Sequence, residues 1–342
     1  MRKILFRVDA NPKIGFGHFY RCLALAKMIS KEFTIVFAMS EASDDIRFIL
    51  INESFPLISL NSFEYSIPDN REGREIDFDL KDHVFLFDII VLDGYWFGNQ
   101  YQSELRKFSV KIIIIEDHNC GSFKADLLIN SAEGLAKTNF SLDNTKGKIL
   151  LGSSYALLRP SFLEFARGDI KYNRKSDRVF ICFGGSDIYN KTLGVSNWFL
   201  ANTKYFLCVV VGKAYPYKEE LNKVINNQPE RAILKEALNE DEIISEMCSS
   251  TFGVVPASGI LLESIACRMP VISGIYVKNH IYNYNGLLEK GAFYPAENFL
   301  PHQLEKACKQ LDENKRIEIV DNQNKTIDGY SDSRIIQCLK EF

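Results

Sequence analysis

The sequence predicts an α/β protein built from two Rossmann-like, doubly wound domains that face a cleft. Apolar runs alternate with amphipathic helical patterns in both halves, which is typical of parallel sheets made of βαβ units. The chain has 342 residues, of which 46% are hydrophobic, and this length favours two domains over one. Each half also opens with a strand, a glycine-rich turn and a helix. Because open α/β sheets bind ligands at the carboxyl ends of their strands, the two turns predict a ligand site in the cleft.

The expected strands are apolar segments bounded by polar turns. The run at 110–115 is rich in β-branched residues and nearly free of charge, as expected for a strand covered on both faces. The expected strands, in chain order, lie at 3–8, 33–38, 84–92, 110–115 and 126–130 in the first half and at 178–183, 205–211, 251–255 and 270–276 in the second.

A charged segment between the two sets of strands predicts the domain boundary. Residues 167–178 contain almost no apolar side chains, as expected of a linker. We therefore expect an N-terminal domain at 1–167 and a C-terminal domain at 178–342. A second polar stretch at 61–83 predicts a surface excursion.

Composition and charge argue against several classes of partner. The net charge is −3 and the basic residues are spread along the chain, so we expect no nucleic-acid partner. The eight cysteines form no Cys-x-x-Cys pair, which predicts reduced, structural thiols and no zinc. The apolar run at 84–92 is too short to cross a bilayer, and no signal peptide precedes the first strand. We therefore expect a cytoplasmic monomer that neither inserts into a membrane nor needs a metal or cofactor.

The turn after the first strand carries the strongest candidate for catalysis. Gly15 and Gly17 permit positive φ and close approach of a ligand, and the first N–H groups of the following helix offer a site for an anion. His18 stands at the mouth of the turn, with Arg21 one helical turn later. Imidazole titrates near neutral pH, which suits proton transfer.

Two other interpretations of this turn stay open. A dinucleotide-binding turn needs a third glycine where this chain has Tyr20, although Glu41 could act as the ribose-binding acid. Alternatively, the glycines only tighten the turn and His18 caps the helix.

Two turns in the second half predict a phosphate site. Gly184-Gly185-Ser186-Asp187 follows the strand at 178–183, and Ser258-Gly259 opens a helix after the strand at 251–255. Small residues at a helix start let a phosphate meet its N-terminus. Glu263, one turn later, could accept two hydrogen bonds from a ribose diol, or it could only complement the helix dipole.

Further polar residues end other strands. Asp93-Gly94-Tyr95 follows the strand at 84–92 and Asn279 follows the one at 270–276, and both belong at carboxyl edges. Glu116-Asp117-His118 ends the next strand, where it could bind substrate or Asp117 could only cap the adjoining turn. No histidine among His83, His118 and His302 has a metal-ligand partner at a convincing spacing.

Several of these motifs, in the same order, resemble a known family. The segments are Phe6-Arg7-Val8-Asp9, Ile14 to His18, Arg21 to Ala26, Ser154 to Phe162, Phe183 to Asp187, Ala257 to Glu263 and Tyr276 to Asn279. Over residues 3–295 the chain is similar to the UDP-sugar hydrolases of pseudaminic acid biosynthesis, also described as spore-coat polysaccharide proteins. This resemblance implies a fold of the glycosyltransferase B type and the removal of UDP from UDP-2,4-diacetamido-2,4,6-trideoxy-β-L-altrose by water.

The resemblance also implies roles for particular residues. His18 matches the catalytic histidine of the family, Tyr95 its active-site tyrosine and Asn279 its substrate-proximal asparagine. The residues that match the UDP site are Gly184, Gly185, Ser186, Asp187, Ser258, Gly259 and Glu263. Asp93-Gly94-Tyr95 departs from the family's Asp-His-Tyr, which puts the identity of the sugar in doubt. A glycosyltransferase and a hydrolysing UDP-sugar 2-epimerase of the same fold remain alternatives.

Overall fold

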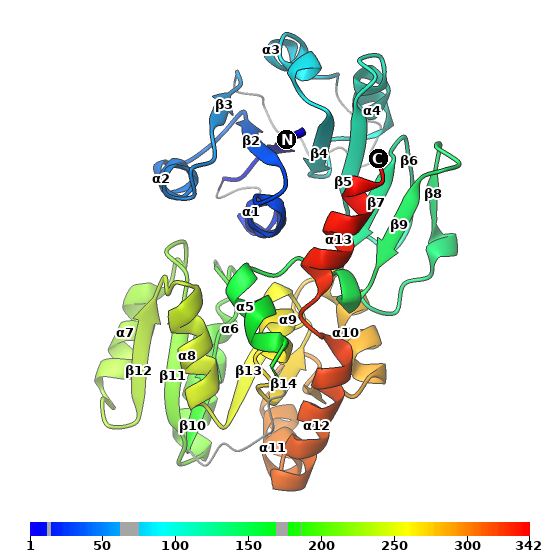
Figure 1. Cartoon of the computed structure of the whole chain (residues 1–342). Coiled ribbons are helices and arrows are strands. Elements are labelled where there is room, and N and C mark those ends of the chain that lie inside the picture. The colour runs from blue at the N-terminus through cyan, green and yellow to red at the C-terminus, as the bar shows by residue number, and fades with distance from the viewer. Residues whose placement is uncertain (12–14, 62–74, 169–176, 186) are drawn as a thin grey trace. The chain divides into compact units, whose positions relative to one another are not determined.

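Two parallel sheets organise the chain (Figure 1). The computed structural model describes residues 1–342 except 12–14, 62–74, 169–176 and 186. Most of the expected linker at 167–178 and of the expected excursion at 61–83 therefore lies outside the described residues. The chain divides into a first unit of residues 1–131, 135–159 and 332–342, and a second unit of residues 132–134 and 160–331. The prediction of two Rossmann-like α/β domains is confirmed.

The sheet of the first unit has seven parallel strands in the order β3-β2-β1-β4-β5-β7-β9. The chain runs outward from β1 in one direction and then returns to continue from β4 in the other, which is the topological switch point of a doubly wound sheet. The strands are β1 (Lys3–Val8), β2 (Thr34–Met39), β3 (Leu57–Ser59), β4 (Ile89–Asp93), β5 (Lys111–Ile115), β7 (Leu127–Asn130) and β9 (Lys148–Leu151), and a separate two-stranded sheet joins β6 (Gly121–Phe123) to β8 (Phe140–Leu142).

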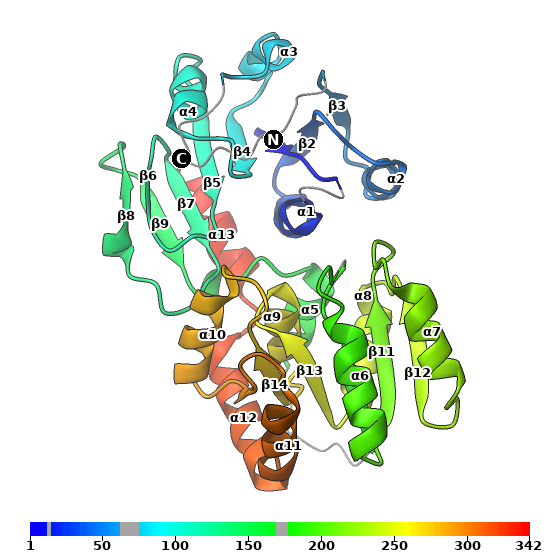
Figure 2. The same ribbon diagram turned by 180° about the vertical axis from the view of Figure 1, so that it is seen from behind.

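The helices of the first unit include the last helix of the chain. In Figure 1, α13 lies in front of β5 and β7, and in the reverse view of Figure 2 it lies behind them. The last residues of the chain are bonded to Arg2, which directly precedes β1, because Arg2 donates to the backbone oxygens of Phe342 and Lys340. The helices are α1 (Gly17–Ile29), α2 (Asp44–Asn52), α3 (Phe78–Lys81), α4 (Asn99–Arg106) and α13 (Ser331–Lys340), with short 3-10 turns at Val84–Leu86, Lys137–Asn139 and Ser153–Tyr155.

The expected strand at 84–92 is wrong in its first half. Residues Val84–Leu86 form a 3-10 turn, and sheet pairing with β1 starts only where the backbone N–H of Asp88 donates to the carbonyl oxygen of Lys3. Phe85 and Leu86 are 70% and 47% exposed. The run at 84–92, which Asp88 interrupts, therefore combines an exposed turn with the buried strand β4.

The sheet of the second unit has six parallel strands in the order β12-β11-β10-β13-β14-β15. Helices cover both of its faces: α8 lies in front in Figure 1, and α6 in Figure 2. The strands are β10 (Arg178–Ile181), β11 (Phe206–Val211), β12 (Ala232–Glu236), β13 (Phe252–Pro256), β14 (Val271–Gly274) and β15 (Tyr294–Pro295). The helices are α5 (Pro160–Ala166), α6 (Lys191–Asn202), α7 (Lys218–Asn226), α8 (Glu240–Ser249), α9 (Gly259–Ala266), α10 (His280–Glu289), α11 (Pro301–Gln310) and α12 (Glu313–Thr326).

The two units differ from the expected domains at both ends. The sequence predicts an N-terminal domain that ends at 167 and a C-terminal domain that begins at 178. In the structure, α5 instead belongs to the second unit, and residues 332–342 belong to the first. The buried guanidinium of Arg268 explains the place of α5, because it donates to the carbonyl oxygens of Ala166 and Ile327. No helix in the described part of the chain is both long and apolar enough to cross a membrane.

Candidate active site

The glycine turn of the first unit delivers two polar side chains to the carboxyl edge of its sheet. Gly15 has φ +86°, a conformation that favours glycine, and its N–H donates to the carbonyl oxygen of Asn11 at 2.8 Å. The helix α1 begins at Gly17, so His18 and Arg21 lie in its first turns. Val8 of β1 pairs in register with Asp93 of β4. This pairing brings the Asp93 carboxylate next to the start of α1.

His18 and Asp93 form a buried dyad. His18 Nδ1 lies 2.6 Å from Asp93 Oδ1, and the two residues are only 6% and 0% exposed. Arg21 Nη2 also lies 2.9 Å from the same ring nitrogen. One nitrogen of a neutral imidazole cannot both donate to Asp93 and accept from Arg21. The shorter contact, to a carboxylate, assigns the proton to Nδ1 and leaves Nε2 as the basic nitrogen.

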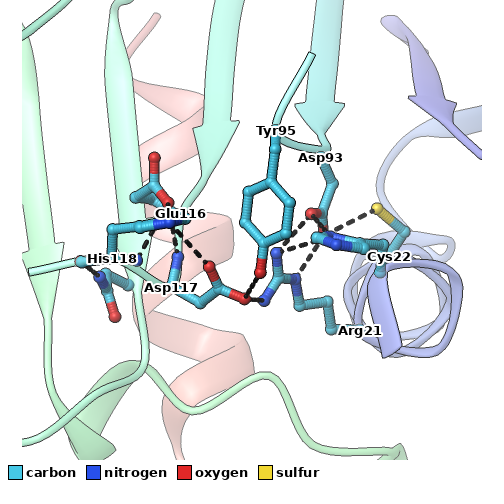
Figure 3. Close-up of polar contacts among 9 residues, drawn as sticks. Arg21, Cys22, Asp93, Tyr95, Glu116, Asp117 and His118 are labelled. Carbon is cyan, nitrogen blue, oxygen red and sulfur yellow. Dashed lines mark hydrogen bonds and ion pairs between the residues drawn. The ribbon is translucent and has the colours of Figure 1, made fainter. Parts of the chain in front are cut away.

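Arg21 joins two carboxylates that come from neighbouring strands. Its Nε and Nη2 donate to Asp93 Oδ2 and Oδ1 at 2.6 and 2.5 Å, and its Nη1 donates to Asp117 Oδ2 at 2.9 Å. The Tyr95 hydroxyl donates to the same Asp117 oxygen at 3.0 Å. Figure 3 shows Arg21 between Asp93 and Asp117, with the phenol of Tyr95 directed at Asp117. These contacts join side chains from α1, from β4 and the turn after it, and from the loop after β5 in one network.

The network sets the charges of its members. Burial alone would raise the pKa values of Asp93 and Asp117, but the charge and hydrogen bonds of Arg21, together with those of the neighbouring histidines, lower both below their ordinary value. Burial and the nearby Asp117 charge raise the pKa of Tyr95, so its hydroxyl stays protonated at neutral pH. The site at pH 7 therefore holds two carboxylates, one guanidinium and one neutral phenol.

The lowered carboxyl pKa values predict how stability depends on pH. A carboxyl whose pKa is lower in the folded state stabilises the fold fully above its unfolded pKa of about 4 and loses that contribution as the pH falls toward the folded pKa. Between about pH 5 and pH 3, we expect the unfolding free energy of the wild type to fall more steeply than that of the Asp117→Asn protein. Urea denaturation at pH 7, 5 and 3 measures this difference. Parallel curves for the two proteins would contradict it.

Glu116, Asp117 and His118 form a close cluster at the end of β5. One ligand atom from each lies within 4.8 Å of the others, so the expectation that His118 lacks a ligand partner at suitable spacing is wrong. Glu116 Oε1 instead accepts from the backbone N–H groups of Asp117 and His118 at 2.9 and 3.0 Å, and it lies 2.8 Å from His118 Nδ1. Arg21 already neutralises Asp117. Glu116 Oε1 and Asp117 Oδ2 are therefore engaged, whereas Asp117 Oδ1 is buried without a hydrogen-bond partner among the described residues and lies 3.2 Å from His118 Nδ1.

The second unit gathers the other predicted residues along one sheet edge. Gly184 (φ +88°) and Gly185 follow β10, Ser258 and Gly259 follow β13, and Asn279 follows β14. These three strands are adjacent in the sheet. Ser258 and Asn279 are the N-cap residues of α9 and α10, and neither side chain caps its helix. Ser186 lies outside the described residues.

Asp187 and Glu263, both near this sheet edge, differ in burial and in their helix. The Asp187 carboxylate is buried and accepts from the backbone N–H groups of Lys191 and Thr192 at 3.0 and 2.7 Å. It therefore organises the start of α6. Glu263 is half-buried in the second turn of α9. The hydroxyl of Tyr276 donates to the carbonyl oxygen of Phe183 at 3.1 Å, which ties the loop after β14 to the turn after β10.

Two side chains of the observed network, Asp117 and Cys22, are not among the site residues that the sequence predicts. The sequence favours Asp117 as a substrate ligand or a cap, whereas in the structure it holds both Arg21 and Tyr95. Cys22 is expected only as a structural thiol, and its Sγ lies 3.5 Å from Asp93 Oδ2. Burial, followed by the charge of Asp93, raises the pKa of the Cys22 thiol, so it stays protonated. The sequence signal for Asp117 is its position directly after the β-branched run at 110–115, where the carboxyl end of a strand is expected.

Comparison with solved structures identifies the class of fold. MurG of Acinetobacter baumannii is 11% identical, with a TM-score of 0.66 and 100% of both chains covered. MnaA of S. aureus, solved in complex with UDP, is 14% identical with a TM-score of 0.63 and covers 100% of this chain and 96% of its own. The chain has the glycosyltransferase B type of fold.

Two curated proteins are related in sequence. The UDP-2,4-diacetamido-2,4,6-trideoxy-beta-L-altropyranose hydrolase of Campylobacter jejuni is 28% identical over 299 residues, which are 84% of this chain and 97% of that protein. An uncharacterized protein of Methanocaldococcus jannaschii is 23% identical over 278 residues, which are 79% of this chain. The match spans only 55% of the length of that second protein. No protein-family model matches the chain.

Proposed function

We propose that this protein is a nucleotide-sugar hydrolase. It would release UDP from a UDP-linked 2,4-diacetamido-trideoxy sugar by attack of water at C1, for the biosynthesis of pseudaminic acid or a related surface polysaccharide. The observation that carries this proposal is the buried His18–Asp93 dyad, which orients one imidazole nitrogen as a base. The 28% identity to the C. jejuni UDP-sugar hydrolase supports the choice of substrate.

In the proposed reaction His18 activates the water. Nε2 accepts a proton from the attacking water, the new bond forms between the water oxygen and C1, and the bond from C1 to the diphosphate oxygen breaks. The water attacks the face of C1 opposite UDP, and UDP leaves with the electron pair of the broken bond. The sugar is therefore released with inverted configuration. The Asp93 carboxylate stabilises the imidazolium that forms. Because the Tyr95 proton is directed at Asp117, the phenol oxygen keeps a lone pair that can accept a hydrogen bond from the water or the sugar.

The second unit would hold the UDP. The glycine turn after β10, comprising Gly184, Gly185, Ser186 and Asp187, and the N-terminus of α9 with Ser258 and Gly259 offer backbone N–H groups for a diphosphate. Glu263 would accept hydrogen bonds from the ribose hydroxyls, and Asn279 would contact the substrate near its reacting carbon. In the first unit, Gly15 and Gly17 would let the sugar approach the backbone.

The test of this proposal is UDP release without an acceptor. The purified protein, treated with EDTA, is incubated with UDP-2,4-diacetamido-2,4,6-trideoxy-β-L-altrose and water alone. We expect UDP to appear at the same rate as without EDTA, because Arg21 already binds Asp117 Oδ2 and backbone N–H groups already bind Glu116 Oε1. Loss of activity with EDTA, restored by a divalent cation, would contradict the metal-free account. Release of UDP only after an alcohol is added would indicate a glycosyltransferase.

One observation favours a hydrolysing UDP-sugar 2-epimerase as the second candidate. The ring of His118 packs against Tyr95 at a centroid distance of 4.8 Å, on the same aromatic side chain that contacts His18 at 4.9 Å. The contact of 2.8 Å between His118 Nδ1 and Glu116 Oε1 orients this second imidazole, as a base acting at C2 would require. Hydrolysis in D2O separates the two reactions, because an epimerase incorporates deuterium at C2 and a simple hydrolase does not.

A further inference from the structure

A pocket inside the first unit extends from the proposed active site. It has a volume of about 400 Å³ and is formed by the loops after β4 and β5 together with β6. This volume lies in the range of pockets for small molecules, about 300–1,000 Å³. Arg21, Tyr95, Glu116 and His118 belong both to its wall and to the polar network described above. A group bound in this pocket would therefore lie beside the network.

The charged groups in the wall are already engaged. All three guanidinium nitrogens of Arg21 donate to Asp93 or Asp117. Glu116 accepts from two backbone N–H groups and faces the His118 ring. An anionic ligand would find no uncommitted cation in this wall, and a cationic ligand would have to compete with these contacts. The pocket thus fits an uncharged group.

The remaining wall combines apolar surface with small neutral polar groups. Leu92, Phe97, Ile114 and Phe123 supply the apolar part, and Asn119 and Ser122 supply hydrogen-bonding groups. An N-acyl group has this same combination, with a methyl beside an amide N–H and C=O. We propose that the pocket is the subsite for an acetamido-bearing face of the sugar. This inference rests on the proposed function, because it assigns the sugar of that same reaction.

Cys120 provides a direct probe of the pocket. It lines the pocket and is the one exposed thiol among the eight cysteines, all of which are described. In the His18→Ala protein, which leaves the substrate intact, alkylation of Cys120 by iodoacetamide is followed by peptide mass spectrometry. We expect UDP-2,4-diacetamido-2,4,6-trideoxy-β-L-altrose at about ten times its dissociation constant to slow this alkylation about tenfold. UDP alone should leave the rate unchanged, and Cys120→Ser should show no label at this position.

A matched pair of variants tests the same pocket by kinetics. Ser122 of β6 lines the pocket, whereas Ser141, its register partner on β8, is also exposed and does not line it. We expect Ser122→Tyr to raise KM for the nucleotide sugar about tenfold or more, since a filled subsite loses at least one good contact of about 1.4 kcal/mol. Ser141→Tyr should leave KM unchanged, and both proteins should keep the wild-type affinity for UDP.

The outcomes separate this inference from the proposed function. Hydrolysis by the wild type without protection of Cys120 would reject the pocket and keep the hydrolase. Protection without hydrolysis would keep the pocket and reject the hydrolase. If the sugar neither protects Cys120 nor is hydrolysed, both proposals are wrong. Equal KM changes for Ser122→Tyr and Ser141→Tyr would also overturn the subsite, because the effect would then come from the small sheet itself.

Discussion

Replacing His18 with alanine should lower the rate of UDP release by about 10²–10⁴-fold, the usual contribution of a general base. The imidazole is nearly buried and fixed by Asp93, so its removal takes away the oriented base of the proposed reaction. UDP affinity should remain at the wild-type level, because we assign UDP binding to the second unit. Steady-state kinetics and calorimetry with UDP measure the two effects separately.

A surface histidine provides the control for this variant. His302 lies exposed in α11 of the second unit, and His302→Ala should retain full activity. If His18→Ala loses activity and UDP affinity in parallel, His18 acts in binding. If it keeps more than about a hundredth of the wild-type rate, the loss is smaller than the usual contribution of a general base, and the assignment of the base is wrong.

Replacing Arg21 with methionine should destabilise the fold as well as inactivate the enzyme. Arg21 is the guanidinium shared by Asp93, which is fully buried, and Asp117. Its removal leaves a buried carboxylate without its cation, and breaking such a pair costs about 3 kcal/mol or more. We expect the urea midpoint to fall at pH 7. Part of this loss should be recovered near pH 5, because the pKa of the uncompensated Asp93 is then raised.

The same helix contains a matched control for this substitution. Lys27 of α1 pairs with Glu53 at 2.7 Å, but the two side chains are 20% and 32% exposed. Lys27→Met should cost about 1 kcal/mol or less, as expected of a pair in contact with solvent, and activity should be retained. Equal destabilisation by the two substitutions would show that the Arg21 network contributes no more than a surface ion pair.

The fold could be predicted because its signal is local and repeated. Buried parallel strands such as β5 appear as β-branched runs, and their alternation with helices limits the topology to a few arrangements. The strand β12 was missed because its last residues, Lys235 and Glu236, are charged and it lies at the edge of its sheet. The place of α13 was missed because its attachment to Arg2 joins opposite ends of the sequence.

The candidate site could be predicted only in part, because some of its contacts join segments that lie far apart in the sequence. His18, Arg21, Asp93 and Tyr95 were expected because each follows a strand at its carboxyl end. The sequence does not show that β4 and β5 are neighbours, so the role of Asp117 in holding Arg21 and Tyr95 depends on tertiary pairing. The pocket around Cys120 depends likewise on the small sheet of β6 and β8, whose three-residue strands carry no clear pattern.

In the proposed reaction, water activated by His18 displaces UDP from the sugar in a single step. Proton and phosphorus NMR of the protein with UDP-2,4-diacetamido-2,4,6-trideoxy-β-L-altrose, without an acceptor, follows both products of this step. We predict that UDP and free sugar appear together and that the first sugar formed has the inverted anomeric configuration. No UDP release, or a first-formed sugar that retains the starting configuration, would rule out this single displacement by water.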